Sequence, residues 1–183
     1  VAGEKDSWSL VNVVARHGKI LKVTDEDDEE TWKINLKESK KTCLPANSSV
    51  VSDMTSLQFF HVPGILHNLK QRSTSDQPYT FLSGSVLVAV NPLQRVKDPK
   101  GTLGKATAVN VPHPYAIAES AYQQLVFNAR RAARSEENND NSKLETPVNQ
   151  SIIVGGESGA GKTESSKYVL KHLVTRTVDS GSK

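Results

Sequence analysis

The feature that most constrains the fold of this chain is a glycine-rich segment at residues 156–163, with the sequence GESGAGKT. A short apolar run at 151–154 precedes it and predicts a β-strand, and the apolar spacing after Thr163 predicts an α-helix. Glycines allow backbone angles that other residues avoid, so successive N–H groups can turn inward around an anion. A strand, then G-x-x-x-x-G-K-T, then a helix predicts a phosphate-binding loop of the P-loop type.

The positions of this loop have distinct expected roles. We expect the Lys162 ammonium to contact the β- and γ-phosphates and to act in catalysis, and the Thr163 hydroxyl to coordinate Mg²⁺. The helix that begins near Gly161 adds free N–H groups and the positive end of its dipole. The carboxylates of Glu157 and Glu164 are not expected to contact phosphate, because a bound triphosphate repels them. The predicted ligands are ATP and Mg²⁺, although the motif is shared by kinases, GTPases, transporters and motors.

Composition, net charge and cysteine count exclude several classes of protein. With 36% hydrophobic and 23% charged residues, the chain is typical of globular proteins. Its net charge of only +3 gives no general attraction to nucleic acid, and its longest apolar runs are too short to span a bilayer. The single cysteine, Cys43, excludes an internal disulfide and fits a reducing, cytoplasmic compartment. The histidines show no spacing typical of metal ligands, so we expect structural or surface roles for His17, His61, His67, His113 and His172.

The N-terminal part has the pattern of a small β unit. Over residues 7–36, apolar and polar residues alternate on both sides of a predicted turn at His17-Gly18. An uninterrupted acidic block at 25–30 separates the second and third predicted strands and is expected to be a solvated loop. Three short strands bury little apolar surface, so this unit is expected to form a small barrel or sheet attached to a larger domain.

The remainder alternates between helical and extended patterns. Residues 53–72 have helical spacing, and 79–90 read as a β-hairpin whose apolar second arm is predicted to be an interior strand. Pro114 suits the first turn of a helix, and the polar residues 135–147 are predicted to form a surface loop.

Several segments together resemble a known family. The sequence GESGAGKTESSK at 156–167 resembles the phosphate loop of the myosin motor domain, and its inner residues differ from those of kinesins and GTPases. Residues 66–72, 79–92 and 112–122 are similar, in order, to the helix, the hairpin and the second helix that precede this loop in myosins. The β unit at 7–36 resembles the SH3-like barrel found before many myosin motors, and the residues after Thr163 are more similar to unconventional myosins.

The resemblance implies a fold of the α/β class. A small N-terminal SH3-like β-barrel at 1–50 would be followed by the beginning of a P-loop motor domain at 51–183, with an incomplete central sheet. By the same resemblance, the purine-contacting segment starts at Asn91-Pro92, and Arg95 stands at a position that is often basic. The match fails beyond it, where Asp98, Pro99 and a glycine-containing insert stand instead of the family's proline and tyrosine. The nucleotide-binding residues implied are Gly156, Glu157, Ser158, Gly159, Ala160, Gly161, Lys162, Thr163, Asn91, Pro92 and Arg95.

The resemblance also implies a function. The chain would be the ATP-binding part of an actin-based motor that couples ATP hydrolysis to movement along actin filaments, cytoplasmic and associated with the cytoskeleton. Switch loops, actin-binding surfaces and sites for light chains or calmodulin would lie beyond Lys183, so we expect an N-terminal piece that is inactive alone. One alternative is a nucleotide-gated actin-binding or scaffold protein without motility, suggested by the unusual segment 94–104. A second alternative is an unrelated P-loop kinase or GTPase.

Overall fold

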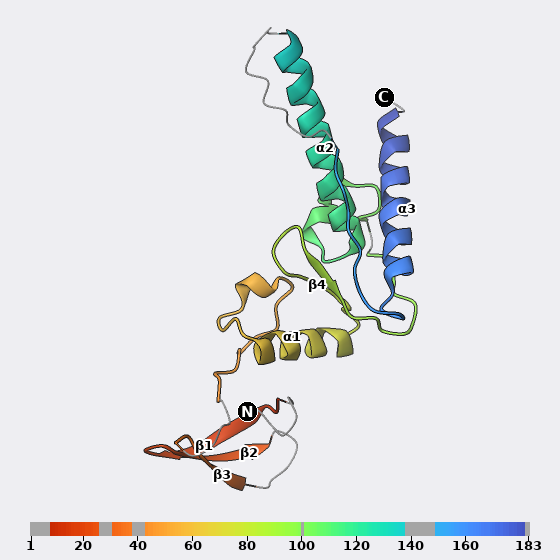
Figure 1. Cartoon of the computed structure of the whole chain (residues 1–183). Helices are drawn as coiled ribbons and strands as arrows, with labels where there is room; N and C mark the ends of the chain where they lie inside the picture. Colours follow the sequence, from red (N-terminus) through yellow and green to blue (C-terminus); the bar gives the residue numbers. More distant parts are fainter. Residues whose placement is uncertain (1–7, 26–30, 38–42, 100, 138–148, 182–183) are drawn as a thin grey trace. The chain divides into compact units, whose positions relative to one another are not determined.

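The computed structural model describes residues 8–25, 31–37, 43–99, 101–137 and 149–181 (Figure 1). The chain divides into two compact units, one made of Val1–Ser49 with Gln58–Ile65 and the other of Val50–Leu57 with Leu66–Lys183. The α/β class predicted from the sequence is confirmed. The domain limits at 1–50 and 51–183 stay a prediction. No helix within the described ranges is long and apolar enough to cross a membrane.

The first unit contains the predicted β structure. Strands β1 (Val11–His17), β2 (Ile20–Asp25) and β3 (Thr31–Asn35) form an antiparallel sheet in the order β1-β2-β3. Its buried core is Leu21, Val23 and Ile34, with Val11 and Cys43 packed against it. The turn between β1 and β2 contains Gly18 at a φ of 60°, a conformation that glycine adopts without steric cost. The acidic block lies outside the described residues, apart from Asp25 at the end of β2.

The second unit contains most of the helical structure. A short 3₁₀ helix, η1 (Met54–Ser56), is followed by α1 (Val62–Thr74), whose first residues belong to the first unit. The predicted hairpin is confirmed as β4 (Tyr79–Phe81) and β5 (Leu87–Ala89), and another 3₁₀ helix, η2 (Ala106–Asn110), lies in the connection that follows. Helices α2 (Pro114–Glu137) and α3 (Lys162–Gly181) run side by side in the same direction (Figure 1).

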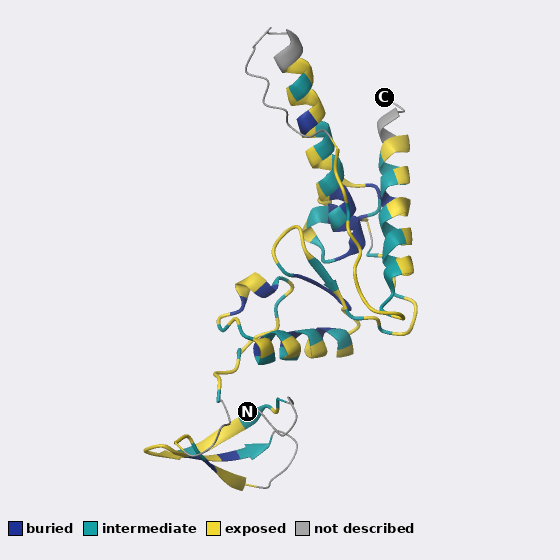
Figure 2. Cartoon of the chain, in the orientation of Figure 1, coloured by how far each residue is buried: buried dark blue, intermediate teal, exposed yellow. Residues whose placement is uncertain are grey.

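One group of buried residues in the second unit lies where α2 meets α3. Figure 2 shows this concentration in the N-terminal part of α2, where Tyr115, Ala116, Ala118 and Glu119 are all buried. Helix α2 begins at Pro114 as predicted, because the missing N–H of proline costs nothing in a first turn. It continues to Glu137, so the predicted surface loop is helical over its first three residues, and 138–147 lie outside the described ranges.

Two predictions about strands are wrong. Residues 151–154 form no strand, and Ile153 is 92% exposed. The second arm of the hairpin is not an interior strand, because β5 pairs with β4 alone among the strands that the structure describes. Both segments have a composition typical of buried strands, but a strand forms only where a neighbour supplies the other half of each hydrogen bond.

Helix α3 does not bury all the apolar residues that its sequence pattern places on one side. Tyr168 and Leu173 are partly buried and His172 is fully buried. Leu170, Val174 and Val178, at successive fourth positions, are more than half exposed. Helix α3 therefore has a packed face toward α2 and an apolar stripe in contact with solvent.

Candidate nucleotide-binding site

The glycine-rich loop has the backbone conformation that its sequence predicts. Gly156, Gly159 and Gly161 have φ angles of 147°, 81° and 89°, values that residues with a Cβ rarely adopt. A tight turn closes the loop, with the N–H of Ala160 donating to the carbonyl of Glu157 at 3.2 Å. A Cβ added to Gly156 would lie 3.1 Å from the Cβ of Ala160, so the loop also needs glycine there for space.

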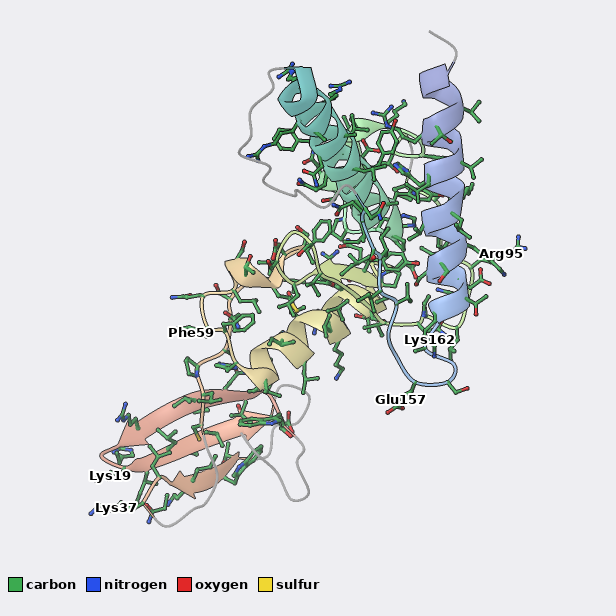
Figure 3. The ribbon with its side chains drawn as sticks, turned by 45° about the horizontal axis from the view of Figure 1, so that its top comes forward. Lys19, Lys37, Phe59, Arg95, Glu157 and Lys162 are labelled. Carbon is green, nitrogen blue, oxygen red and sulfur yellow. The ribbon has the colours of Figure 1, made fainter. Side chains whose placement is uncertain are left out.

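Lys162 lies at the first position of α3 and reaches back across this loop. Its Nζ donates to the carbonyls of Gly156 and Glu157 at 2.8 and 2.7 Å. Figure 3 shows Lys162 at the base of α3, while the side chain of Glu157 points outward from the bend of the loop. The structure therefore places a positive charge inside the curve of the loop and a carboxylate outside it. This arrangement favours an anion within the loop.

The residues present fit a polyphosphate and a magnesium ion. The first backbone bond of α3 joins the N–H of Ser165 to the carbonyl of Gly161 at 3.0 Å. The N–H groups of Lys162, Thr163 and Glu164 donate to no acceptor among the described residues, as in the first turn of any helix. Exposed N–H groups and the helix dipole suit a phosphate, and the exposed hydroxyl of Thr163 suits a hard cation. No group of three or more His, Cys, Asp or Glu residues that could hold a metal exists within the described ranges.

The structure brings one residue of the predicted purine segment to the loop. Asn91 donates from Nδ2 to the carbonyl of Gly159 at 2.7 Å, and Gly161 lies close to the same side chain. Pro92 follows immediately in the chain. Arg95 is exposed, and Figure 3 shows its side chain pointing away from Lys162. Asn91 therefore contacts the loop directly, whereas the side chain of Arg95 lies away from it.

A buried polar pair between the two helices was missed by sequence reasoning. Glu119 on α2 accepts a hydrogen bond from Nε2 of His172 on α3 at 2.9 Å, and neither side chain is exposed. Burial opposes ionisation of Glu119, but hydrogen bonds from His172 and Gln123 and the charge of Arg176 hold its pKa below the ordinary value. A glutamate among the alanines and tyrosines of the apolar face of α2 was the available signal.

A second missed group surrounds His113, directly before α2. Its ring packs edge-to-face against Tyr79, Tyr115 and Tyr168. Nδ1 accepts from the N–H of Tyr115 at 3.3 Å, and Nε2 has no hydrogen-bond partner among the described residues. Burial lowers the pKa of His113 to about 4, so the ring is neutral at physiological pH. For His113 this packing agrees with the structural or surface role that was expected of each histidine.

The two glutamates beside the loop lie at the surface. Glu164 forms an ion pair with Lys167 at 2.6 Å, with both side chains 65% exposed, and Glu157 is exposed at the bend. Neither carboxylate lies inside the curve of the loop, which is consistent with the expectation that they do not contact phosphate.

Comparison with known proteins identifies the family. The family model of the myosin head (motor domain) matches residues 51–182. These residues include the loop, Asn91, Glu119 and His172. The chain belongs to the myosin head family. The match excludes an unrelated P-loop kinase or GTPase.

Relatives of this myosin head segment extend the similarity toward the N-terminal β unit. Myosin-8 of Arabidopsis thaliana is 39% identical over 176 residues, which cover 92% of this chain and 10% of that protein. Myosin-6 of the same plant is 35% identical over 175 residues, with the same coverage of 92% and 10%. Myosin-13 is 32% identical over 177 residues, covering 81% of this chain and 11% of that protein. The chain thus spans about a tenth of the length of these relatives.

Proposed function

We propose that this chain is the ATP-binding part of an actin-based motor, in which hydrolysis of Mg-ATP drives movement along actin filaments. The observation that carries the proposal is the Lys162 ammonium held 2.7–2.8 Å from two loop carbonyls, within a glycine loop of a myosin head segment. An ammonium in that position, beside free N–H groups of α3, is suited to a triphosphate.

The residues of the loop have separable tasks in this proposal. Lys162 neutralises negative charge on the transferred phosphoryl group, and the backbone of Gly156–Thr163 orients the phosphates. Thr163 provides one oxygen ligand for Mg²⁺, which supplies further charge neutralisation when bound. Asn91 fixes the start of the predicted purine segment, Asn91-Pro92 through Arg95, against the loop by its bond to Gly159.

The remaining parts of the motor are assigned to other segments of a longer protein. No segment of residues 1–183 resembles the switch loops, the actin-binding surfaces or the light-chain or calmodulin sites of the family. Among the strands that the structure describes, β5 pairs only with β4, and this edge together with the exposed segment 151–154 supports a larger sheet in the longer protein. The apolar stripe of α3 supports a further element that packs on this helix. A cytoplasmic, cytoskeleton-associated location follows from binding to actin filaments.

The test is Lys162→Ala in the full-length protein, with Lys167→Ala as the matched control on the same helix. Lys167 pairs with the exposed Glu164 and does not reach the loop, so its loss should leave turnover near normal. Lys162→Ala should lower the actin-activated ATPase rate by at least about 100-fold, because transition-state charge loses its stabilisation. Near-normal turnover in Lys162→Ala contradicts the proposal. Normal Mg-ATP binding by the wild type without filament movement supports the non-motile, nucleotide-gated alternative.

A further inference from the structure

The segment from Asn91 to Asp98 is attached to the phosphate loop and its helix at successive points. Asn91 donates to the carbonyl of Gly159 at 2.7 Å, and the hydroxyl of Tyr168 lies 3.4 Å from the carbonyl of Val96. Asp98 then pairs with Lys171 at 2.5 Å. The segment therefore starts beside the loop and follows α3 over its first three turns.

Asp98 is the point at which this segment is tied to both helices. Its Oδ2 accepts from Nζ of Lys171 and, at 2.9 Å, from the hydroxyl of Tyr115. Tyr115 is fully buried on α2, and its ring contacts His113, Tyr168 and His172. We call Asp98, Lys171 and Tyr115 the brace. Tyr115 is the buried residue of the brace, whereas the side chains of Lys171 and Asp98 are 49% and 38% exposed.

The charge states of the brace suit its hydrogen bonds. Burial opposes ionisation of Asp98, but the hydrogen bonds from Lys171 and Tyr115 hold its pKa below the ordinary value. Burial, together with the bond to Asp98, raises the pKa of Tyr115 to about 12, so its hydroxyl keeps its proton and remains a donor. At physiological pH Asp98 is therefore the acceptor and Tyr115 a donor in these bonds.

Between its attachments the segment presents side chains that contribute nothing to the core. Leu93 is 89% exposed and has a φ of 54°, a conformation that is strained for leucine, and Arg95 is also exposed. Exposed residues on a backbone that is fixed at both ends, beside a phosphate loop, are typical of a ligand-contacting segment.

We propose that the brace is a positioning element for the nucleoside end of the ligand, holding segment 91–98 in place while residues 156–163 bind the phosphates. This inference rests on the proposed nucleotide-binding function. Without the brace the segment keeps its attachments at Asn91 and Val96 but loses the one at Asp98. That end would then have to be ordered when ligand binds, and the ordering lowers affinity for the nucleoside. Affinity for a bare polyphosphate should not change, because loss of the brace leaves the bond between Asn91 and the loop in place.

The experiment compares Mg-ATP with magnesium tripolyphosphate, titrated calorimetrically into the full-length protein. The variants are Lys171→Ala and Asp98→Asn, and Lys167→Ala removes another exposed ion pair of α3 as the control. We expect Mg-ATP to bind about fivefold more weakly to either brace variant, the scale of an exposed ion pair, with tripolyphosphate unchanged. The reversed pair, Asp98→Lys with Lys171→Asp, should recover much of the lost affinity.

Three results would be decisive against the brace. Unchanged Mg-ATP affinity in both variants overturns it, and so does an equal loss for Mg-ATP and tripolyphosphate, because that indicates a structural effect on the whole site. An equal loss in Lys167→Ala also overturns it. If the wild-type protein binds neither ligand, the proposed nucleotide-binding function itself fails, which is a different outcome from any of these. Lys171 is half-exposed, so its variant is expected to fold normally.

Discussion

The phosphate loop is built differently from the buried layer between α2 and α3, by which we mean His113, Tyr115, Glu119 and His172. The loop is a contiguous stretch whose shape comes from glycine backbone angles and one lysine. The buried layer consists of side chains that come from distant parts of the chain, such as Glu119 and His172, which are 53 residues apart. The loop is largely exposed, whereas the layer excludes solvent.

This difference separates two physical roles. The loop offers donors and charge to a ligand, and most of its residues are exposed. The layer joins α2 to α3 and the connection at Gly104, whose N–H donates to Nδ1 of His172 at 3.2 Å. Changes in the layer should therefore alter the free energy of unfolding, and changes in the loop should alter ligand affinity.

The largest expected effect comes from removing the buried carboxylate. Glu119→Ala removes the acceptor of the buried His172 and one carboxylate partner of Arg176, and breaking a buried pair costs about 3–5 kcal/mol of unfolding free energy. Glu164→Ala removes an exposed glutamate that pairs with Lys167 and should cost less than about 1 kcal/mol. Denaturant titration measures both, and equal costs would remove the distinction between the two regions.

Acid should destabilise the layer before it affects the loop. The pKa of His113 is about 4 in the folded chain and 6.5 as its ordinary value, so the unfolded state binds more protons between these pH values. The free energy of unfolding should therefore fall as the pH is lowered from 6.5 to 4, by about 3 kcal/mol in total. In His113→Phe this part of the pH dependence should disappear, and an unchanged slope in denaturation measurements at several pH values would show that another group is responsible.

The smallest of the three effects concerns the loop, where two adjacent glycines differ. Gly156 has a φ of 147° and little space for a Cβ, whereas a Cβ on Gly155 meets nothing within 4 Å. Gly156→Ala should weaken Mg-ATP binding by about 1–3 kcal/mol, because the exposed loop can relieve the backbone strain only by leaving its binding conformation. Since that change is confined to the loop, thermal stability should be nearly unchanged. Gly155→Ala should change neither quantity. A loss of stability without a loss of affinity in Gly156→Ala would reverse the roles assigned to loop and layer.

Local sequence was sufficient to predict the loop and most helices and strands. The glycines, Lys162 and Thr163 are neighbours in sequence, so their arrangement follows from local backbone rules. Helix α2 was predicted to begin at Pro114 for the same reason, and the strands of the first unit follow from their alternating pattern.

The features that sequence reasoning did not predict depend on partners that are distant in the sequence. Residues 151–154 have a strand-like composition, but composition does not supply a neighbouring strand. The brace joins Asp98 to Lys171 across 73 positions, a distance at which spacing carries no information about contact. For Asp98, the departure from the family pattern marked the position but not the partner.

The apolar stripe of α3 has a consequence for how such a protein is made. Synthesis proceeds from the N-terminus, so in a longer protein Leu170, Val174 and Val178 leave the ribosome before any later segment can cover them. During that interval the stripe favours association between nascent chains.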